Sequence, residues 1–200
     1  AFLIRDNIRH RNDILNAYLD AIEQAQSEIL IANAYFMPGV RFGRALYAAA
    51  QRGVRITVLL QGKTDHQLLR YATQALYAAA LRAGIRIFEY EKSFMHAKVA
   101  VIDGTWATVG SSNIDPFSLL LAKEANLVVR DALFGSELRN SLKQAIAEGA
   151  HELQAEDLSR LPWHSRLLRW LAYGMVRAMV GIAGYGQRHW HSHDVKPEGR

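Results

Sequence analysis

The most constraining feature of this sequence is a repeated unit in which an amphipathic helix ends near a glycine and a short apolar strand follows. Two copies are visible: helices over residues 40–51 and 67–82, Gly53 and Gly84 after them, and strands over 54–60 and 85–90. Apolar residues recur every three or four positions in each helix, and each glycine suits a left-handed helix cap. The repeat predicts an α/β fold, with a largely parallel mixed sheet flanked by helices on both faces.

Further elements surround these two units: a helix over 13–26, a strand over 28–32, a strand over 124–129 and a helix over 132–148. Strands over 97–102 and 106–109 fit a hairpin, because Asp103-Gly104 between them is a favoured turn. The composition changes after Gly149, where a polar stretch begins. We therefore expect one α/β domain over residues 1–150 and a separate C-terminal segment over 151–200.

The first strand of the predicted hairpin carries a histidine and a lysine two positions apart. Alternation along a strand places His96, Lys98 and Ala100 on one face, and residues 97, 99 and 101 on the other. An imidazole can attack phosphorus or protonate a leaving alkoxide, and a nearby ammonium offsets charge on the phosphate oxygens. The pair therefore predicts chemistry on a phosphodiester.

Two downstream features fit the same chemistry. The run from Gly110 to Asn113, which includes Ser111, predicts a tight turn whose backbone and side-chain donors face the phosphate. Glu124 is a candidate acceptor for the imidazole nitrogen that faces away from the substrate, and this hydrogen bond would fix the tautomer of His96.

The spacing of these residues, His-x-Lys-x4-Asp-x6-Gly-Ser-x-Asn from His96 to Asn113, resembles the HKD signature of the phospholipase D superfamily. Residues 33–38 and 110–118 look like the C-terminal half of bacterial cardiolipin synthases, those of the B type above all. The resemblance runs from about Phe2 to Glu148 and so covers nearly the whole predicted domain.

The resemblance implies that His96, Lys98 and Asp103 form the catalytic motif. His96 is implied to be either the nucleophile that becomes a phosphohistidine or the general acid, and the C-terminal histidine of two-motif members is usually the acid. Asp103 is implied to be a structural and electrostatic partner rather than a reactant.

The resemblance also implies substrate contacts: Lys98 and Asn113 bind phosphate oxygens with help from Ser111, and Glu124 orients His96. Cardiolipin synthases often have an asparagine two residues before this glutamate, where the present chain has Ala122. This difference affects the prediction of the acceptor alcohol more than it affects the prediction of phosphoryl chemistry.

One histidine cannot both attack phosphorus and protonate the leaving oxygen in the same step, because in-line displacement places the two on opposite sides. No other histidine of the chain has a lysine two positions on. A second HKD half-domain is therefore expected as a partner, either a missing N-terminal half, which we favour, or a second copy of this chain.

Asn33 and His66 lie just past the ends of predicted strands, where α/β sheets bind ligands, and are further candidate substrate contacts. Loops at these positions are polar in any case. No cofactor is implied, and no metal, since the sequence shows no acidic cluster suited to Mg²⁺ or Ca²⁺. The absence of cysteine also excludes disulfides and thiolate metal sites.

The C-terminal segment is typical of a helix that lies on a membrane surface. Between residues 163 and 182 an apolar arc of leucine and methionine faces a cluster formed by Arg166, Arg169 and Arg177. The net charge of +5 agrees with an anionic phospholipid surface. No apolar run reaches a spanning length, so we expect peripheral binding to the cytoplasmic face of the cell membrane. The other interpretation is a helix packed on the missing half-domain.

These features favour a cardiolipin synthase, which transfers a phosphatidyl group from one phosphatidylglycerol to another and releases glycerol. Two rivals stay open: a homodimeric HKD phosphodiesterase or nuclease, which also fits one motif per chain, and an inactive membrane-binding half-domain. We expect no nucleic-acid partner under the leading hypothesis. The acceptor alcohol cannot be read from the catalytic core, because several acceptors require the same core.

Overall fold

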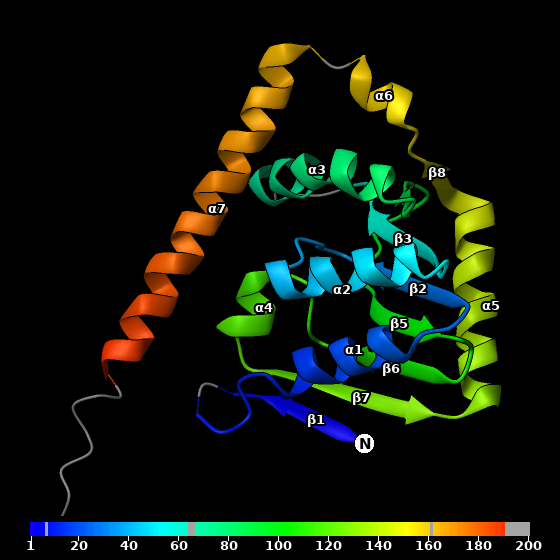
Figure 1. The fold of residues 1–200 in the computed structure, drawn as a ribbon. Helices are drawn as coiled ribbons and strands as arrows, with labels where there is room; N and C mark the ends of the chain where they lie inside the picture. The colour runs from blue at the N-terminus through cyan, green and yellow to red at the C-terminus, as the bar shows by residue number, and fades with distance from the viewer. Residues whose placement is uncertain (7, 64–66, 161, 191–200) are drawn as a thin grey trace, which may run out of the picture.

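The structure is a computed structural model that describes the chain except residues 7, 64–66, 161 and 191–200. Figure 1 shows its elements. The strands are β1 (Phe2–Arg5), β2 (Glu28–Asn33), β3 (Arg55–Gln61), β4 (Arg86–Tyr90), β5 (Lys98–Ile102), β6 (Trp106–Gly110), β7 (Glu124–Arg130) and β8 (Ala150–Glu152). The helices are α1 (Asp13–Gln24), α2 (Val40–Gln51), α3 (Gln67–Arg82), α4 (Pro116–Leu120), α5 (Ala132–Gly149), α6 (Ala155–Ser159) and α7 (Trp163–Trp190).

The described strands form one sheet in the order β1-β7-β6-β5-β2-β3-β4-β8. The predicted mixed α/β sheet is confirmed, but less of it is parallel than expected. Only β2, β3 and β4 pair in parallel, and every other pairing between the described strands is antiparallel. The difference arises because β5 and β6 form a hairpin, whose strands are antiparallel, and because β1, β7 and β8 run opposite to the strands they pair with.

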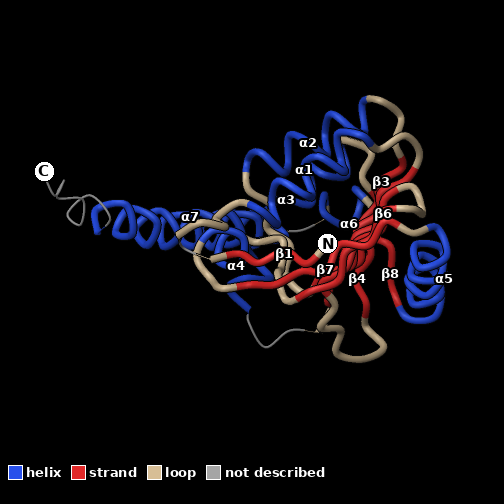
Figure 2. Tube along the Cα trace, turned by 90° about the horizontal axis from the view of Figure 1, so that it is seen from below, coloured by secondary structure: helices blue, strands red, loops and turns tan. Residues whose placement is uncertain are grey.

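Helices cover both faces of the sheet, as predicted (Figure 2). One face packs against α1, α2 and α3 in a core that includes Tyr18, Phe42 and Tyr77. The other face packs against α5, which contributes Leu142. Burial of apolar side chains in these two layers is the main source of stability for such a fold.

Backbone geometry confirms the turns read from the sequence. Gly53 and Gly84 follow α2 and α3 with φ of +86° and +79°, the left-handed conformation in which glycine carries no steric cost. Asp103 and Gly104, with φ of +51° and +67°, turn the chain between β5 and β6. The predicted hairpin is confirmed, since Ile102 pairs with Trp106 across that turn.

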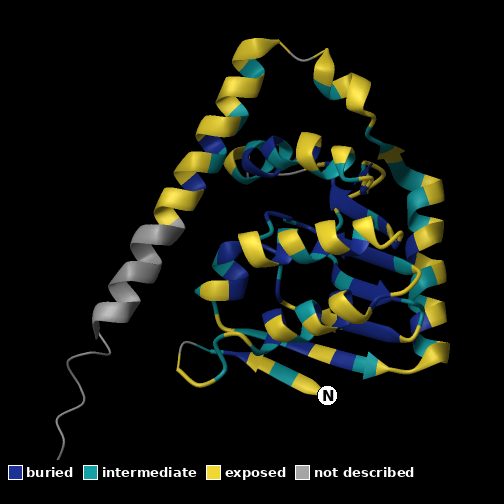
Figure 3. Ribbon diagram, in the orientation of Figure 1, coloured by how far each residue is buried: buried dark blue, intermediate teal, exposed yellow. Residues whose placement is uncertain are grey.

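Past residue 150 the chain adds one short strand to the sheet and then turns away from it. β8 pairs with the edge strand β4. The long helix α7 packs on α3 through Ala172 and Val176, while much of its opposite surface is exposed (Figure 3). Within the described part of the chain, no helix combines the length and hydropathy needed to cross a bilayer.

The strand directions bring several chain segments to one edge of the sheet. β2, β3 and β4 end there, and β5 begins there, because Asn33 at the end of β2 pairs with Lys98 at the start of β5. β6 also ends at this edge and β7 begins there, since Gly110 pairs with Asn126. We call it the site edge.

The buried Tyr18 offers a test of this packing. Its hydroxyl has no hydrogen-bond partner within the described residues, and a buried unpaired hydroxyl costs stability. Tyr18→Phe is expected to raise the free energy of unfolding by about 1 kcal/mol. Tyr77→Phe is the matched control, because the Tyr77 hydroxyl donates to Glu89 at 2.9 Å. Chemical denaturation should show this control losing stability; a loss of stability in Tyr18→Phe would contradict the packing described.

Candidate active site

His96 lies in the extended segment that leads into β5, and its side chain is exposed at the site edge. The backbone on both sides of it is fixed. The N–H of Met95 donates to the side-chain oxygen of Gln61 at the end of β3, and the N–H of Ala34 donates to the carbonyl of Ala97 at 2.9 Å. The imidazole is therefore accessible to a substrate while its Cα is anchored from two strands.

Lys98 is the first residue of β5 and is only 7% exposed. It lies on the same face as Ala100, and Val101 lies on the other, as alternation predicted. Its ammonium donates to the carbonyl of His96 at 3.1 Å. A mostly buried cation thus lies against the backbone of the residue that carries the exposed imidazole.

The electrostatics around Lys98 combine opposing effects. Burial lowers the pKa of Lys98, because a low-dielectric site disfavours the charged form, and the carboxylates of Glu124 and Asp115 act to raise it. Asp115 itself has a raised pKa, chiefly through burial, although amide donors of α4 act to lower it. An anion entering the site would meet a poorly solvated ammonium, which strengthens the attraction.

The turn after β6 is held against β7 with little space to spare. A Cβ on Gly110 would lie 2.2 Å from the side-chain oxygen of Asn126, so only glycine fits there. That same oxygen accepts from the N–H of Ser112 at 3.3 Å, and Asn126 donates in turn to Thr108. The position of Ser111, between these anchors, is therefore set by buried polar contacts.

Ser111 and Glu124 contact each other directly at the mouth of this turn. The Ser111 hydroxyl donates to the Glu124 carboxylate, and it accepts from the N–H of Ala125 at 3.0 Å. Glu124, at the start of β7, is partly exposed. Glu124 therefore accepts a hydrogen bond from Ser111 and acts electrostatically on Lys98. A hydrogen bond from His96 to Glu124 stays a prediction.

Two asparagine side chains at the site edge have polar atoms without partners. The Asn33 side-chain oxygen accepts from the N–H of Ile114 at 3.1 Å, which ties β2 to the turn after β6. Among the described residues, the side-chain nitrogen of Asn33 and the side-chain oxygen of Asn113 are buried and have no hydrogen bond. Buried polar groups are normally satisfied, so these atoms are suited to a bound substrate.

Asp103 lies at the opposite end of β5 from His96. Its carboxylate accepts from the N–H groups of Gln26, Ser27 and Glu28 at 2.8–2.9 Å and from the Ser27 hydroxyl at 2.8 Å. Burial acts to raise the pKa of Asp103, but these hydrogen bonds outweigh it, and the pKa is lowered. The structure thus separates Asp103 from the other motif residues by the length of a strand.

His66 falls outside the described residues. Among those described, no group of three or more His, Cys, Asp or Glu side chains could hold a metal ion. Sequence reasoning missed two positioning residues. One is Gln61, a polar residue at the end of a buried apolar strand. The other is Arg5, 2% exposed, whose guanidinium donates to the carbonyls of Leu120 and Ala122 before β7.

Comparison with known proteins gives a consistent result. Residues 18–146 match the family described as "Cardiolipin synthase, PLD-like domain". The chain is 42% identical to cardiolipin synthase B of Shigella flexneri over 185 residues, covering 92% of this chain and 45% of that protein. It is 31% identical to cardiolipin synthase A of Proteus mirabilis, covering 80% and 33%. The chain thus spans less than half the length of these relatives.

Solved structures share the fold at low identity. Phosphatidylserine synthase of Haemophilus influenzae matches with a TM-score of 0.71 and 13% identity, over 92% of this chain and 47% of that chain. Nuc of Salmonella typhimurium, a phospholipase D family member, matches with a TM-score of 0.64 and 18% identity, over 77% and 97%.

Asp103→Asn tests the structural role of the motif aspartate. Asparagine tolerates positive φ but lacks the charge that strengthens these hydrogen bonds, so we expect a loss of about 1–3 kcal/mol in unfolding free energy. Because the pKa of Asp103 is lowered in the folded state, the difference from wild type should be largest near neutral pH and shrink below pH 3.8, its ordinary value. Denaturation at several pH values checks this. An unchanged stability with turnover lost at 25 °C would instead place Asp103 in the chemistry.

Lys98→Arg tests the buried ammonium. Burial lowers the pKa of Lys98, so the wild type should lose this cation as pH rises through a value below the ordinary 10.5, whereas arginine stays charged. We expect the variant to have lower activity at pH 7 but to keep it to higher pH. Profiles of kcat/KM from pH 7 to 11 check this, with Lys98→Met expected to be at least about a hundredfold slower. Identical alkaline limbs for wild type and Lys98→Arg would contradict the assignment.

Proposed function

This chain belongs to the PLD-like domain family of cardiolipin synthases, and from that premise we propose that it supplies one half of a phosphatidyl-transferring active site. The observation that carries the proposal is an exposed His96 whose backbone carbonyl accepts from the buried Lys98 ammonium, which brings both residues to the site edge. The unpartnered amide atoms of Asn33 and Asn113 at the same edge support it. Together they supply a nucleophile or acid, a cation and hydrogen-bonding groups for a phosphodiester.

The proposed reaction has two displacements at phosphorus. In the first, a histidine nitrogen attacks the phosphorus of one phosphatidylglycerol, and the bond from phosphorus to the head-group glycerol oxygen breaks. A second histidine donates a proton to that oxygen, and glycerol leaves. In the second, the primary hydroxyl of another phosphatidylglycerol gives its proton to the second histidine and attacks phosphorus, and the phosphorus–nitrogen bond breaks. Lys98 offsets charge on the phosphate oxygens throughout.

The second imidazole comes from outside this chain. In-line displacement places the attacking and leaving groups on opposite sides of phosphorus, so His96 serves only one of them. The match covers 45% of cardiolipin synthase B of Shigella flexneri and 33% of cardiolipin synthase A of Proteus mirabilis, which leaves room for a second half-domain. We propose that this half-domain faces the site edge and closes the substrate cleft.

The outer face of α7 supports peripheral association with a membrane. Leucine and methionine side chains along this face are about half exposed, and Trp163 is 75% exposed. Tryptophan and basic residues beside an apolar stripe are typical of helices that lie in a bilayer interface. The match to cardiolipin synthase B covers 92% of this chain, so it extends well into α7.

A homodimeric phosphodiesterase is the second candidate. One observation favours it: the match covers 97% of the Nuc chain. A chain with this fold can therefore consist of little more than the sheet and its helices. In such a dimer, a second copy of this chain would supply the other imidazole. Cleavage of DNA in the presence of EDTA, by a dimer seen in light scattering, would favour this candidate.

The direct test of the proposed function is conversion of phosphatidylglycerol by the complete protein. We expect wild-type protein to form cardiolipin and glycerol in equal amounts, and His96→Ala to lose at least about a thousandfold in rate, because one of the two imidazoles is gone. Thin-layer chromatography of the lipids, with an enzymatic assay for glycerol, measures both products.

His151→Ala is the matched control, since His151 is an exposed histidine on β8, which three strands separate from β5 in the sheet. It should convert phosphatidylglycerol at the wild-type rate. Absence of cardiolipin with the wild-type protein, or equal rates for His96→Ala and wild type, would overturn the proposed function.

A further inference from the structure

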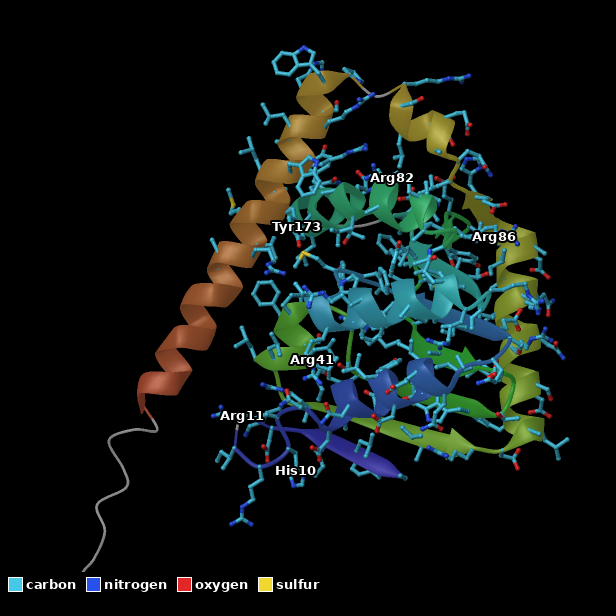
Figure 4. All side chains as sticks on the ribbon, viewed as in Figure 1. His10, Arg11, Arg41, Arg82, Arg86 and Tyr173 are labelled. Atoms are coloured by element: carbon cyan, nitrogen blue, oxygen red, sulfur yellow. The ribbon has the colours of Figure 1, made fainter. Side chains whose placement is uncertain are left out.

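A groove lies between α3, α6 and α7, apart from the site edge. Its volume is about 320 Å³, at the lower end of the range for small-molecule sites. The α3 wall is formed by the middle and C-terminal turns of the helix, and Arg82 lies on this wall (Figure 4). None of the residues that line the groove belongs to the candidate active site.

The lining of the groove combines positive charge with apolar walls. Its charged side chains are Arg82, Arg166 and Arg169, and its apolar walls include Leu158 and Trp170. None of the described lining residues is acidic. Guanidinium groups bind phosphate through paired, charge-assisted hydrogen bonds, so this set favours a phosphate ester attached to an apolar body.

A second observation points to a ligand that carries a hydroxyl or another donor. The side-chain oxygen of Gln74, a lining residue on α3, is buried and has no hydrogen-bond partner among the described residues. A buried acceptor of this kind is normally satisfied. A polar head group with hydroxyl donors would satisfy it, while the arginines take its phosphate.

The three arginines have different local roles. Arg82 donates to the carbonyl of Ala78 in its own helix at 3.1 Å, and Arg166 donates to the carbonyl of Ser159 in α6. Arg169 is attracted electrostatically to the buried carboxylate of Glu89, which accepts a hydrogen bond from the Tyr77 hydroxyl. Substitution of Arg82 and Arg166 therefore probes the groove with less disturbance of the core than substitution of Arg169.

The groove adjoins the exposed apolar face of α7. Leu167, Leu168 and Leu171 on that face are between 49% and 59% exposed, and Trp170, which lines the groove, is 57% exposed. Arg166 and Arg169 lie on the other side of α7 from Leu168 and Leu171, so a lipid with its phosphate in the groove would reach the apolar face past Trp170. Charge and apolar surface thus select the same partner, an anionic lipid in a bilayer.

We propose that this groove binds the head group of an anionic phospholipid at a site distinct from the catalytic one. The lipid phosphate lies among Arg82, Arg166 and Arg169, and its acyl chains lie along Leu158, Trp170 and the outer face of α7. The site anchors the protein on anionic membranes while other lipids react at the site edge. This inference rests on the membrane association in the proposed function, but not on turnover.

Vesicle co-sedimentation of the complete protein tests the site. The groove variant is Arg82→Gln/Arg166→Gln, and the matched control, Arg44→Gln/Arg130→Gln, removes the same charge from exposed positions on α2 and β7. All proteins carry His96→Ala, so that the lipid is not consumed. We expect the groove variant to bind vesicles of phosphatidylglycerol and phosphatidylcholine at least about tenfold more weakly, and the control to bind within about twofold of its parent.

Three results would overturn the inference. The first is unchanged vesicle binding of the groove variant, and the second is an equal loss of binding in the groove variant and the control. The third is release of the parent protein from vesicles by 10 mM inorganic phosphate to the level of the groove variant, which would make the ligand a free anion. Thermal unfolding of both variants confirms that the fold is retained. Catalysis is measured separately with His96 intact: absence of cardiolipin from the wild type contradicts the proposed function alone, and unchanged vesicle binding of the groove variant contradicts the groove alone.

A second readout places the lipid in the groove. Acyl chains brominated near the head group quench tryptophan fluorescence on contact. We expect such phosphatidylglycerol to quench the wild-type protein more than Trp170→Phe, since Trp170 lines the groove. Equal quenching of the two proteins would mean that the lipid does not lie beside Trp170, as would happen if another part of the protein covered this surface.

Discussion

The pairing of β5 with β2 on one side and β6 on the other is the constraint on which the rest of the site depends. It places Lys98 opposite Asn33, largely buried, with its ammonium on the carbonyl of His96. A buried ammonium is costly unless anions or dipoles surround it, and Glu124 and Asp115 favour its charged form. Burial makes the charged ammonium energetically unfavourable, and the same burial strengthens its attraction for a phosphate.

Polar contacts with the loops around β5 set the shape of the site. Asn33 holds the turn after β6, Gln61 holds the segment before His96, and Arg5 holds the residues before β7. Asp103 works at the far end of the strand, where four donors converge on its carboxylate and close the hairpin against β2. The three residues of the HKD signature therefore lie in different places: His96 and Lys98 are at the site edge, and Asp103 is at the far end of β5, where it fixes the hairpin.

Local patterns predicted most of the fold, because helix caps, turn residues and strand alternation act over a few residues. The glycines after α2 and α3 and the turn at Asp103 are examples. The edge strand β8 was missed, since three residues carry little periodic signal. The motif placed His96 and Lys98 at one site, but it could not reveal Gln61, Arg5 or the bond between Ser111 and Glu124. Those contacts depend on which distant segments the sheet brings together.

A crystal structure of the complete protein with vanadate would show whether His96 and Lys98 contact the same phosphoryl group. Vanadate adopts the five-coordinate geometry of phosphorus in the transition state of in-line displacement. We expect vanadium within bonding or hydrogen-bonding reach of the His96 imidazole, with the Lys98 ammonium and the Asn113 amide on its oxygens. Vanadate bound elsewhere with the site edge empty, or a Lys98 ammonium directed away from the bound oxyanion, would contradict it.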